Sequence, residues 1–187
     1  HDLRNPGVVG YEALLRWNDP TLGEVSPASF VPLAEDTQQI ESIGDWALST
    51  ALLDARRFPP HVRLAVNVSP VQLREPKFPQ RVADLLAAHE FPAQRLEFEL
   101  TESATIAGDE NMVKVLLELR RLGVRTAVDD FGTGYASLSY LRRLPVNVVK
   151  IDKSFVSGVD GNPADSAIVL GVIGMAHGLG LTVLAEG

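Results

Sequence analysis

The chain contains no cysteine among its 187 residues, and aromatic residues make up only 6% of it. The absence of cysteine excludes a disulfide framework, a thiol nucleophile and a cysteine-based zinc site. The rest of the composition, 45% hydrophobic and 22% charged, excludes a disordered tail or a collagen-like repeat. We therefore expect residues 1–187 to form one globular domain with a sizeable core.

Long hydrophobic runs and an excess of positive charge are also missing. The longest nearly apolar stretch, 167–176, is interrupted by glycine and is shorter than the ~20 residues that a membrane-spanning helix needs. With 17 Lys and Arg against 24 Asp and Glu, the net charge is −7, so we expect no basic stripe that binds long nucleic acid. The chain begins at His1 without Met and ends directly after an apolar run, so we expect a segment of a longer protein.

Short apolar runs alternate with longer helical patterns along the whole chain. Runs rich in Val, Leu, Ile and Phe predict six buried strands at 8–17, 62–69, 96–101, 125–131, 146–151 and 181–185. Helices are predicted at 30–58, 78–89, 111–122, 135–144 and 163–179. This alternation predicts βαβ units and a parallel sheet, as in a doubly wound fold or a (β/α)₈ barrel. No Gly-x-Gly-x-x-Gly follows a strand, which counts against a dinucleotide-binding doubly wound fold.

Polar side chains gather near the carboxyl ends of the predicted strands. They include Glu12, Arg16, Asn67, Glu97, Glu99, Glu102, Asp129, Asp130, Lys150, Asp152 and Glu186. Barrel active sites are built at these strand ends, and buried carboxylates are costly unless they are paired or bind a metal. The sequence therefore predicts a ring of acidic, amide and lysine side chains at one mouth of a barrel.

The residue types in this ring favour a particular chemistry. Carboxylates and an Asn carbonyl form an all-oxygen site, which suits Mg²⁺ or Mn²⁺ better than zinc. Asp129 and Asp130 are adjacent and could bridge a second ion, and two ions about 4 Å apart are the usual clamp for phosphodiester displacement. Lys150 would offset substrate charge or orient water, and Glu186 is a candidate base or further ligand.

Structural explanations for the same residues stay open at this point. Asp129 and Asp130 could form a turn, Lys150 could pair with Asp152, and Asn67 could cap a turn. A single carboxylate after an apolar strand is usually a solvated loop residue. The recurrence of such residues at the same end of six strands favours the functional interpretation.

Six motifs, in this order, resemble those of the EAL domain family, the bacterial cyclic di-GMP phosphodiesterases. They are YEALLRW at 11–17, NVS at 67–69, ELTE at 99–102, DDFGTGY at 129–135, VKID at 149–152 and AEG at 185–187. The seven-residue DDFGTGY string is the most specific of them. The similarity runs along the whole chain.

The resemblance implies a TIM-type (β/α)₈ barrel that hydrolyses cyclic di-GMP to linear pGpG in second-messenger signalling, with two Mg²⁺ or Mn²⁺ ions. It implies that Glu12, Asn67, Glu99 and Asp129 hold the first ion and that Asp130 helps to hold the second. It assigns Lys150 and Glu186 to the attacking water, Glu102 to steadying the loop 131–137, and Arg16 and Asp152 to the substrate.

The resemblance also predicts partners and leaves alternatives. We expect a homodimer through 135–144, which would expose Tyr135, Leu138, Tyr140 and Leu141, and a parent protein with N-terminal sensory or GGDEF domains. We expect a cytoplasmic domain, and a membrane anchor elsewhere in the parent stays open. A non-catalytic cyclic di-GMP sensor or a dimerising scaffold is the alternative, but the intact set of ligands favours the enzyme.

The sequence departs from the family pattern at two places. Gln38 and Gln39 stand where the family usually has Gly-Leu, a peripheral difference. The family's first strand and everything after the AEG motif are absent, so we expect an EAL-type domain that is incomplete at both ends. About six of the eight strands of a full barrel would then be present.

Overall fold

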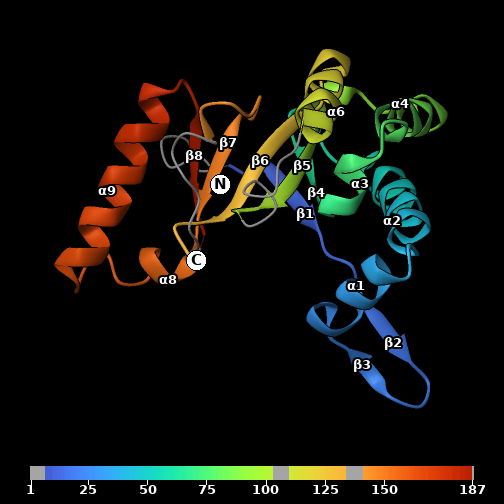
Figure 1. Cartoon of the computed structure of the whole chain (residues 1–187), viewed down its shortest axis with the longest axis horizontal. Coiled ribbons are helices and arrows are strands. Elements are labelled where there is room, and N and C mark those ends of the chain that lie inside the picture. The colour runs from blue at the N-terminus through green and yellow to red at the C-terminus, as the bar shows by residue number, and fades with distance from the viewer. Residues whose placement is uncertain (1–6, 103–109, 134–140, 187) are drawn as a thin grey trace.

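A curled parallel sheet forms the centre of the computed structural model, which describes residues 7–102, 110–133 and 141–186. Six strands lie in the order β1-β4-β5-β6-β7-β8, so each lies beside the next along the chain (Figure 1). They are β1 Gly10–Ala13, β4 Arg63–Asn67, β5 Leu96–Thr101, β6 Arg125–Phe131, β7 Val148–Ile151 and β8 Thr182–Ala185. The predicted α/β fold, with about six parallel strands of a barrel, is confirmed.

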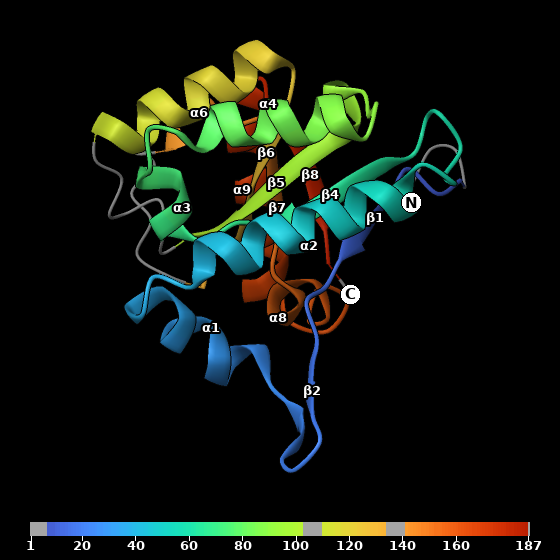
Figure 2. The same ribbon diagram turned by 90° about the vertical axis from the view of Figure 1, so that its right-hand side faces the viewer.

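Helices connect the strands, and the longer ones cover the outer face of this sheet (Figure 2). The helices are α1 Pro27–Asp36, α2 Ile40–Ala55, α3 Pro70–Arg74, α4 Phe78–Ala88, α6 Glu110–Leu122, α8 Lys153–Val156 and α9 Pro163–Gly178, with the 3₁₀ turn η1 Ala93–Arg95. Figure 2 shows α2, α4 and α6 side by side over the strands. Apolar side chains fill the space between the layers, and the rings of Phe78 and Phe98 lie 5.6 Å apart there. The helices thus leave the other face and the strand ends for polar groups.

The segment expected to be one helix at 30–58 forms two helices, α1 and α2. Gln38 lies between them with a φ of 59°, a left-handed conformation that an α-helix cannot continue. Thr37 closes α1 by donating its Oγ1 hydrogen to the Leu33 carbonyl oxygen, at 2.7 Å. The sequence offered neither glycine nor proline at this break, so the periodicity concealed it.

The first strand is shorter than expected, because β1 ends at Ala13 and the chain then forms an antiparallel hairpin. The hairpin comprises β2 Trp17–Asp19 and β3 Gly23–Val25, which the apolar pattern did not predict. Its turn needs Gly23, whose φ is 74°. Figure 1 shows that the hairpin and α1 project away from the sheet.

Only the last part of the helix expected at 135–144 lies within the described residues. Leu141 is 4% exposed and belongs to the hydrophobic core, so the expectation that it forms part of an exposed dimer surface is wrong. It packs within the core cluster that also contains Leu144 and Val146 just before β7. Tyr135, Leu138 and Tyr140 lie outside the described residues.

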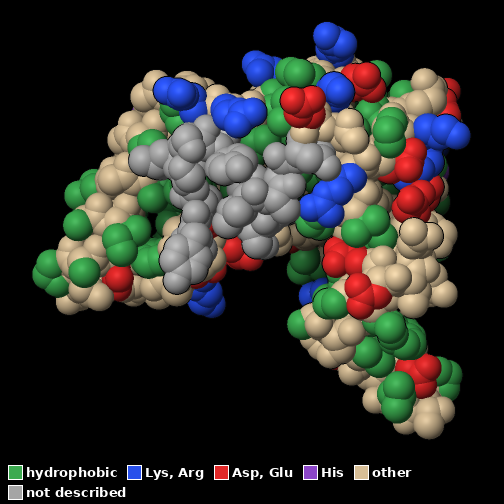
Figure 3. Space-filling view, in the orientation of Figure 1, with side chains coloured by type: hydrophobic (Ala, Val, Ile, Leu, Met, Phe, Trp, Pro, Cys, Tyr) green, Lys and Arg blue, Asp and Glu red, His purple; other side chains and the backbone are tan. Residues whose placement is uncertain are grey.

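Charge is unevenly distributed over the molecule. Lys and Arg side chains gather along the upper edge in Figure 3, where the strands begin, and Arg63 and Arg125 are the first residues of β4 and β6. The predicted acidic ring belongs to the opposite edge, where the strands end. Among the described residues, no helix combines the length and the hydrophobicity needed to cross a membrane.

Candidate active site

The carboxyl edge of the sheet brings several of the predicted residues onto neighbouring strands. Asn67 is paired in register with Glu99, and Thr101 is paired with Asp129. The Asn67 side-chain nitrogen donates to Glu12 Oε1 at 2.7 Å. This bond uses the amide donor and leaves the amide oxygen of Asn67 free to bind a cation.

Lys150 is the centre of the buried part of the site. Its side chain is 4% exposed, and its Nζ lies 2.7 Å from Glu186 Oε1 and 3.0 Å from both Glu99 Oε2 and Asp129 Oδ2. Burial alone would lower the pKa of Lys150. Hydrogen bonds to Glu186, Glu99 and Asp129, together with the charge of Glu99, outweigh burial and raise the pKa, so Lys150 is an ammonium ion.

Glu99 is the most deeply buried of the three carboxylates that contact Lys150. It is 3% exposed, and burial raises its pKa to about 8 although the neighbouring ammonium of Lys150 opposes the shift. The charges of Glu12 and Asp129 raise it further. Asp129, Asp130 and Glu186 lie together beside the single ammonium of Lys150, so acidic groups outnumber basic groups in this part of the site.

A bulge in β6 brings Asp129 and Asp130 to the same side of the sheet. Val128 pairs with Val149 and Phe131 pairs with Ile151, so the two aspartates together oppose the single residue Lys150. Asp130 has a φ of 54°, which departs from the extended backbone of a regular strand. Without the bulge, consecutive side chains would point to opposite faces.

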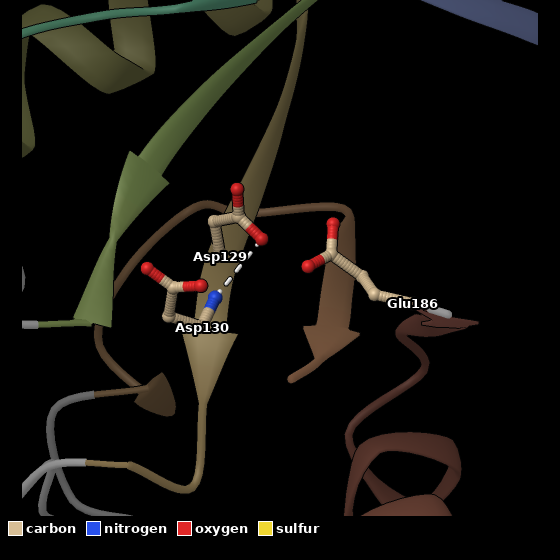
Figure 4. Close-up of side chains that lie close together, drawn as sticks. All are labelled: Asp129, Asp130 and Glu186. Atoms are coloured by element: carbon tan, nitrogen blue, oxygen red, sulfur yellow. Dashed lines mark hydrogen bonds between the residues drawn. The ribbon is translucent and has the colours of Figure 1, made fainter. Parts of the chain in front are cut away.

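The two aspartates meet Glu186, which directly follows β8. Figure 4 shows the three side chains turned toward one another, and one carboxylate oxygen of each lies within 4.8 Å of the others. The Asp130 backbone N–H also donates to Asp129 Oδ1 at 2.9 Å. Burial raises the pKa of Asp130, and the nearby charges of Asp129 and Asp152 add to this effect. An all-oxygen cluster with this charge fits a hard divalent cation such as Mg²⁺ or Mn²⁺.

Glu102 ties the end of β5 to the segment that follows the bulge. It is 3% exposed, and its Oε2 accepts a hydrogen bond from the Gly132 backbone N–H at 2.7 Å. Gly132 has a φ of 105°, and a Cβ there would lie 2.9 Å from the Phe155 ring. Glu102 thus contacts the beginning of the loop that it was expected to steady, while residues 134–137 of that loop lie outside the described residues.

The two residues assigned to the substrate make other contacts. Arg16 is exposed, donates to the Leu15 carbonyl oxygen at 2.9 Å, and lines a shallow hollow of about 470 Å³ with Glu24, Ser26 and Pro27. Asp152 caps α8 by accepting hydrogen bonds from Ser154, which lower its pKa. In the part of the chain that the structure describes, neither one hydrogen-bonds to the acidic cluster.

Sequence reasoning missed one hydrogen bond close to the site. Ser69, which follows β4, donates to Glu35 Oε1 on α1 at 2.6 Å. The Ser-Pro pair after an apolar strand could have indicated a helix N-cap, and Ser69 does cap α3. Nothing in the sequence indicated that Glu35 would meet it.

Comparison with known proteins supports one family. The family model described as "EAL domain" matches residues 1–187. The cyclic di-GMP phosphodiesterase PA2567 of Pseudomonas aeruginosa is 42% identical over 191 residues, which cover 100% of this chain and 32% of that protein. The oxygen sensor protein DosP of Escherichia coli is 40% identical, with 96% of this chain and 23% of DosP covered.

Two solved structures are similar in fold as well. The MucR phosphodiesterase from Pseudomonas aeruginosa, in complex with c-di-GMP, matches with a TM-score of 0.87 and 37% identity, covering 96% of this chain and 74% of that one. The FimX EAL domain of Pseudomonas aeruginosa bound to c-di-GMP matches with a TM-score of 0.86 and 25% identity, at the same coverage of 96% and 74%. The chain spans no more than 32% of the length of the curated relatives described above.

Proposed function

This chain belongs to the EAL domain family, and from that premise we propose that it hydrolyses cyclic di-GMP to linear pGpG with the help of two Mg²⁺ or Mn²⁺ ions. The observation that carries the proposal is the cluster of Asp129, Asp130 and Glu186, placed beside the Lys150 ammonium at the carboxyl edge of the sheet. The relative named a cyclic di-GMP phosphodiesterase, 42% identical, supports the same reaction.

The donor set divides into two groups of oxygen atoms. Glu12, Asn67, Glu99 and Asp129 come from four neighbouring strands and would hold one ion, and Asp130 would join Asp129 in holding the second. Bound there, such ions neutralise phosphate charge and make a bound water more acidic. Because carboxylates outnumber the single ammonium, the negative charge of the site would favour the binding of cations.

The remaining residues orient the reactants. Lys150 holds Glu186, Glu99 and Asp129 in fixed positions through its three ion pairs. Glu186 keeps one carboxylate oxygen near the two aspartates and would take a proton from the attacking water. Glu102 would hold the backbone after Asp130 through Gly132, Arg16 would contact a substrate phosphate, and Asp152 would contribute to substrate binding.

One assay tests both the substrate and the ions. The protein is incubated with cyclic di-GMP in Mg²⁺, Mn²⁺, Ca²⁺ or excess EDTA, and pGpG is measured by chromatography. We expect turnover with Mg²⁺ and Mn²⁺, little with Ca²⁺ because it accepts looser coordination, and none with EDTA. Equal turnover in EDTA would exclude the metal mechanism, and binding without turnover under all conditions would favour the sensor.

We also propose a homodimer and a larger parent protein. The dimer would form through residues 135–144, without a contribution from the buried Leu141. The relative MucR of Pseudomonas aeruginosa is named a bifunctional diguanylate cyclase and cyclic di-GMP phosphodiesterase, and this chain covers 27% of it. We propose that the parent of this chain likewise combines domains, with N-terminal sensory or GGDEF domains and a cytoplasmic EAL domain. Light scattering of the intact protein at micromolar concentration tests the dimer.

A further inference from the structure

The hairpin β2–β3 and helix α1 form a small lobe, residues 14–36, that carries Arg16. This lobe projects from the sheet (Figure 1). Within it, Trp17 packs edge-to-face against Phe30 of α1, with ring centroids 5.6 Å apart at 90°. Arg16 precedes Trp17 directly, so the placement of α1 relative to the sheet also places Arg16.

One side-chain hydrogen bond joins this lobe to the strand layer. Glu35 Oε1, on α1, accepts the hydroxyl proton of Ser69 at 2.6 Å. Within residues 7–102, 110–133 and 141–186, the other side-chain hydrogen bonds that reach the lobe come from Thr37, which only closes the end of α1. A bond to a carboxylate is charge-assisted and stronger than one between neutral groups.

The partner of Glu35 is a fixed point next to the site. Ser69 is 8% exposed, its backbone N–H donates to Gln72 Oε1 at 3.1 Å, and its Oγ accepts from the Val71 N–H at 3.1 Å. Gln72 is itself buried and packs so closely on Gly44 of α2 that any side chain at position 44 would collide with it. Ser69 lies two residues after Asn67, which holds Glu12.

We propose that Glu35 is a positioning residue, which sets the distance between Arg16 and the Glu12–Asn67 pair by holding Ser69. The proposal rests on the proposed function, in which Arg16 contacts a substrate phosphate while Glu12 and Asn67 bind an ion. Loss of the Glu35–Ser69 bond would let the lobe shift. Arg16 would then bind the substrate less well, while the groups around Lys150 would stay in place.

Three variants of the full-length protein test this role: Glu35→Ala, Glu35→Gln and, as a matched control, Asp36→Ala, which removes an exposed carboxylate from the same helix. We expect Glu35→Ala to raise the KM for cyclic di-GMP about tenfold with kcat within about twofold, the pattern of lost substrate binding. Glu35→Gln should stay near wild type, because its amide oxygen still accepts the Ser69 hydroxyl. Asp36→Ala should have no effect.

A second comparison separates positioning from general stability. In an Arg16→Ala background, Glu35→Ala should cause no further rise in KM, because the residue through which it acts is gone. The proposal would be overturned if Glu35→Ala raised KM equally with and without Arg16, or if Asp36→Ala raised KM as much as Glu35→Ala does.

Hydrogen–deuterium exchange of residues 14–36 gives a readout that does not depend on turnover. Faster exchange of the lobe in Glu35→Ala, but not in Asp36→Ala, is expected, and unchanged exchange would overturn the proposal. If the wild-type protein fails to hydrolyse cyclic di-GMP, the proposed function fails, and the exchange result still decides whether Glu35 holds the lobe.

Discussion

At the residue scale, the side chain of Asn67 has two polar atoms that face different partners. Its amide nitrogen donates to Glu12, and its amide oxygen is the atom that would bind a cation under the proposed function. Asp129 likewise accepts from Lys150 through Oδ2 and from the Asp130 N–H through Oδ1. Side chains held in this way have little freedom, which would lower the entropic cost of binding a cation there.

We expect Glu12→Ala, Asn67→Ala and Asp129→Asn each to lower the turnover of cyclic di-GMP at least about 100-fold, because each removes an oxygen ligand or its charge. Initial rates of pGpG formation at saturating Mg²⁺ measure the effect. Glu118→Gln, which changes an exposed carboxylate on α6, is the control. Wild-type rates in all three variants would favour the sensor over the enzyme.

The substitution Lys150→Met separates two roles of the buried ammonium, which are to balance the charge of its neighbours and to support turnover. Without metal, the variant leaves Glu99, Asp129 and Glu186 without a counter-charge, so we expect a loss of about 3–5 kcal/mol in the free energy of unfolding. Mn²⁺ should restore part of this loss, because a cation replaces the missing charge. Turnover should fall more than substrate binding.

Urea unfolding with and without Mn²⁺ measures the stability effect of Lys150→Met. Lys153→Met, on an exposed lysine of α8, is the matched control and should shift neither curve. An equal stabilisation by Mn²⁺ in the wild type and in Lys150→Met would show that the ammonium and the cation do not share the site.

At the element scale, the connection between β6 and the following loop depends on one glycine. Gly132→Ala would force a side chain into a backbone conformation with a φ of 105° and to within 2.9 Å of the Phe155 ring. We expect a loss of about 2 kcal/mol in stability and a lower turnover, because the Gly132 N–H would leave Glu102.

Gly174→Ala is the matched control for Gly132→Ala. Gly174 lies in α9 with no atom within 4 Å of an added Cβ, so this variant should be neutral or stabilising by about 0.5–1 kcal/mol. Thermal unfolding of the two variants gives the comparison. A neutral Gly132→Ala would show that the loop can rearrange without cost.

The elements that could be read from the sequence are those in which apolar pattern and burial agree. Strands β5 and β6 begin and end where predicted, because each contains several apolar residues within a short segment and Gly123 ends the helix before β6. The hairpin after β1 and the break at Gln38 could not be predicted from the sequence, because the pattern of apolar residues does not change at either place.

The sequence predicted part of the site, because the carboxyl ends of parallel strands lie at the same edge of a sheet. Residue types and positions were enough to predict that Asn67, Glu99 and Asp129 lie together. The ion pair between Lys150 and Glu186 could not be predicted in this way, because it depends on the register in which β8 pairs with β7. The bulge that turns Asp130 toward Asp129 is a backbone irregularity, and a period of two would have placed these side chains on opposite faces. Asp152, which shares the parity of Lys150, instead caps a helix.

At the scale of the whole molecule, the described part of the sheet has two unpaired edges. Within the described residues, β1 pairs only with β4, and β8 pairs only with β7. Large apolar side chains are exposed near both edges, including Tyr11 at 50% and Leu184 at 38%, and Leu170 on α9 is 68% exposed. Such edges favour self-association unless another strand covers them.

We expect a polypeptide limited to residues 1–187 to self-associate and to hydrolyse cyclic di-GMP slowly. A polypeptide extended by about 30 residues at each end, toward full barrel length, should be monodisperse and faster. Light scattering and initial rates compare the two. A short polypeptide that is soluble, unfolds cooperatively and is equally fast would contradict this expectation.

The opposite charges of the two sheet edges determine the order in which partners can bind. Arginines begin β4 and β6, and the carboxylates of Asp129, Asp130 and Glu186 lie together where the strands end, so we expect the mouth of the site to repel anions when no cation is bound. A dinucleotide with two phosphates meets this repulsion until divalent cations have reversed the local charge. If the proposed function holds, we expect an ordered sequence, cations first and nucleotide second, with an association rate of the substrate that depends on cation concentration even when the substrate is abundant.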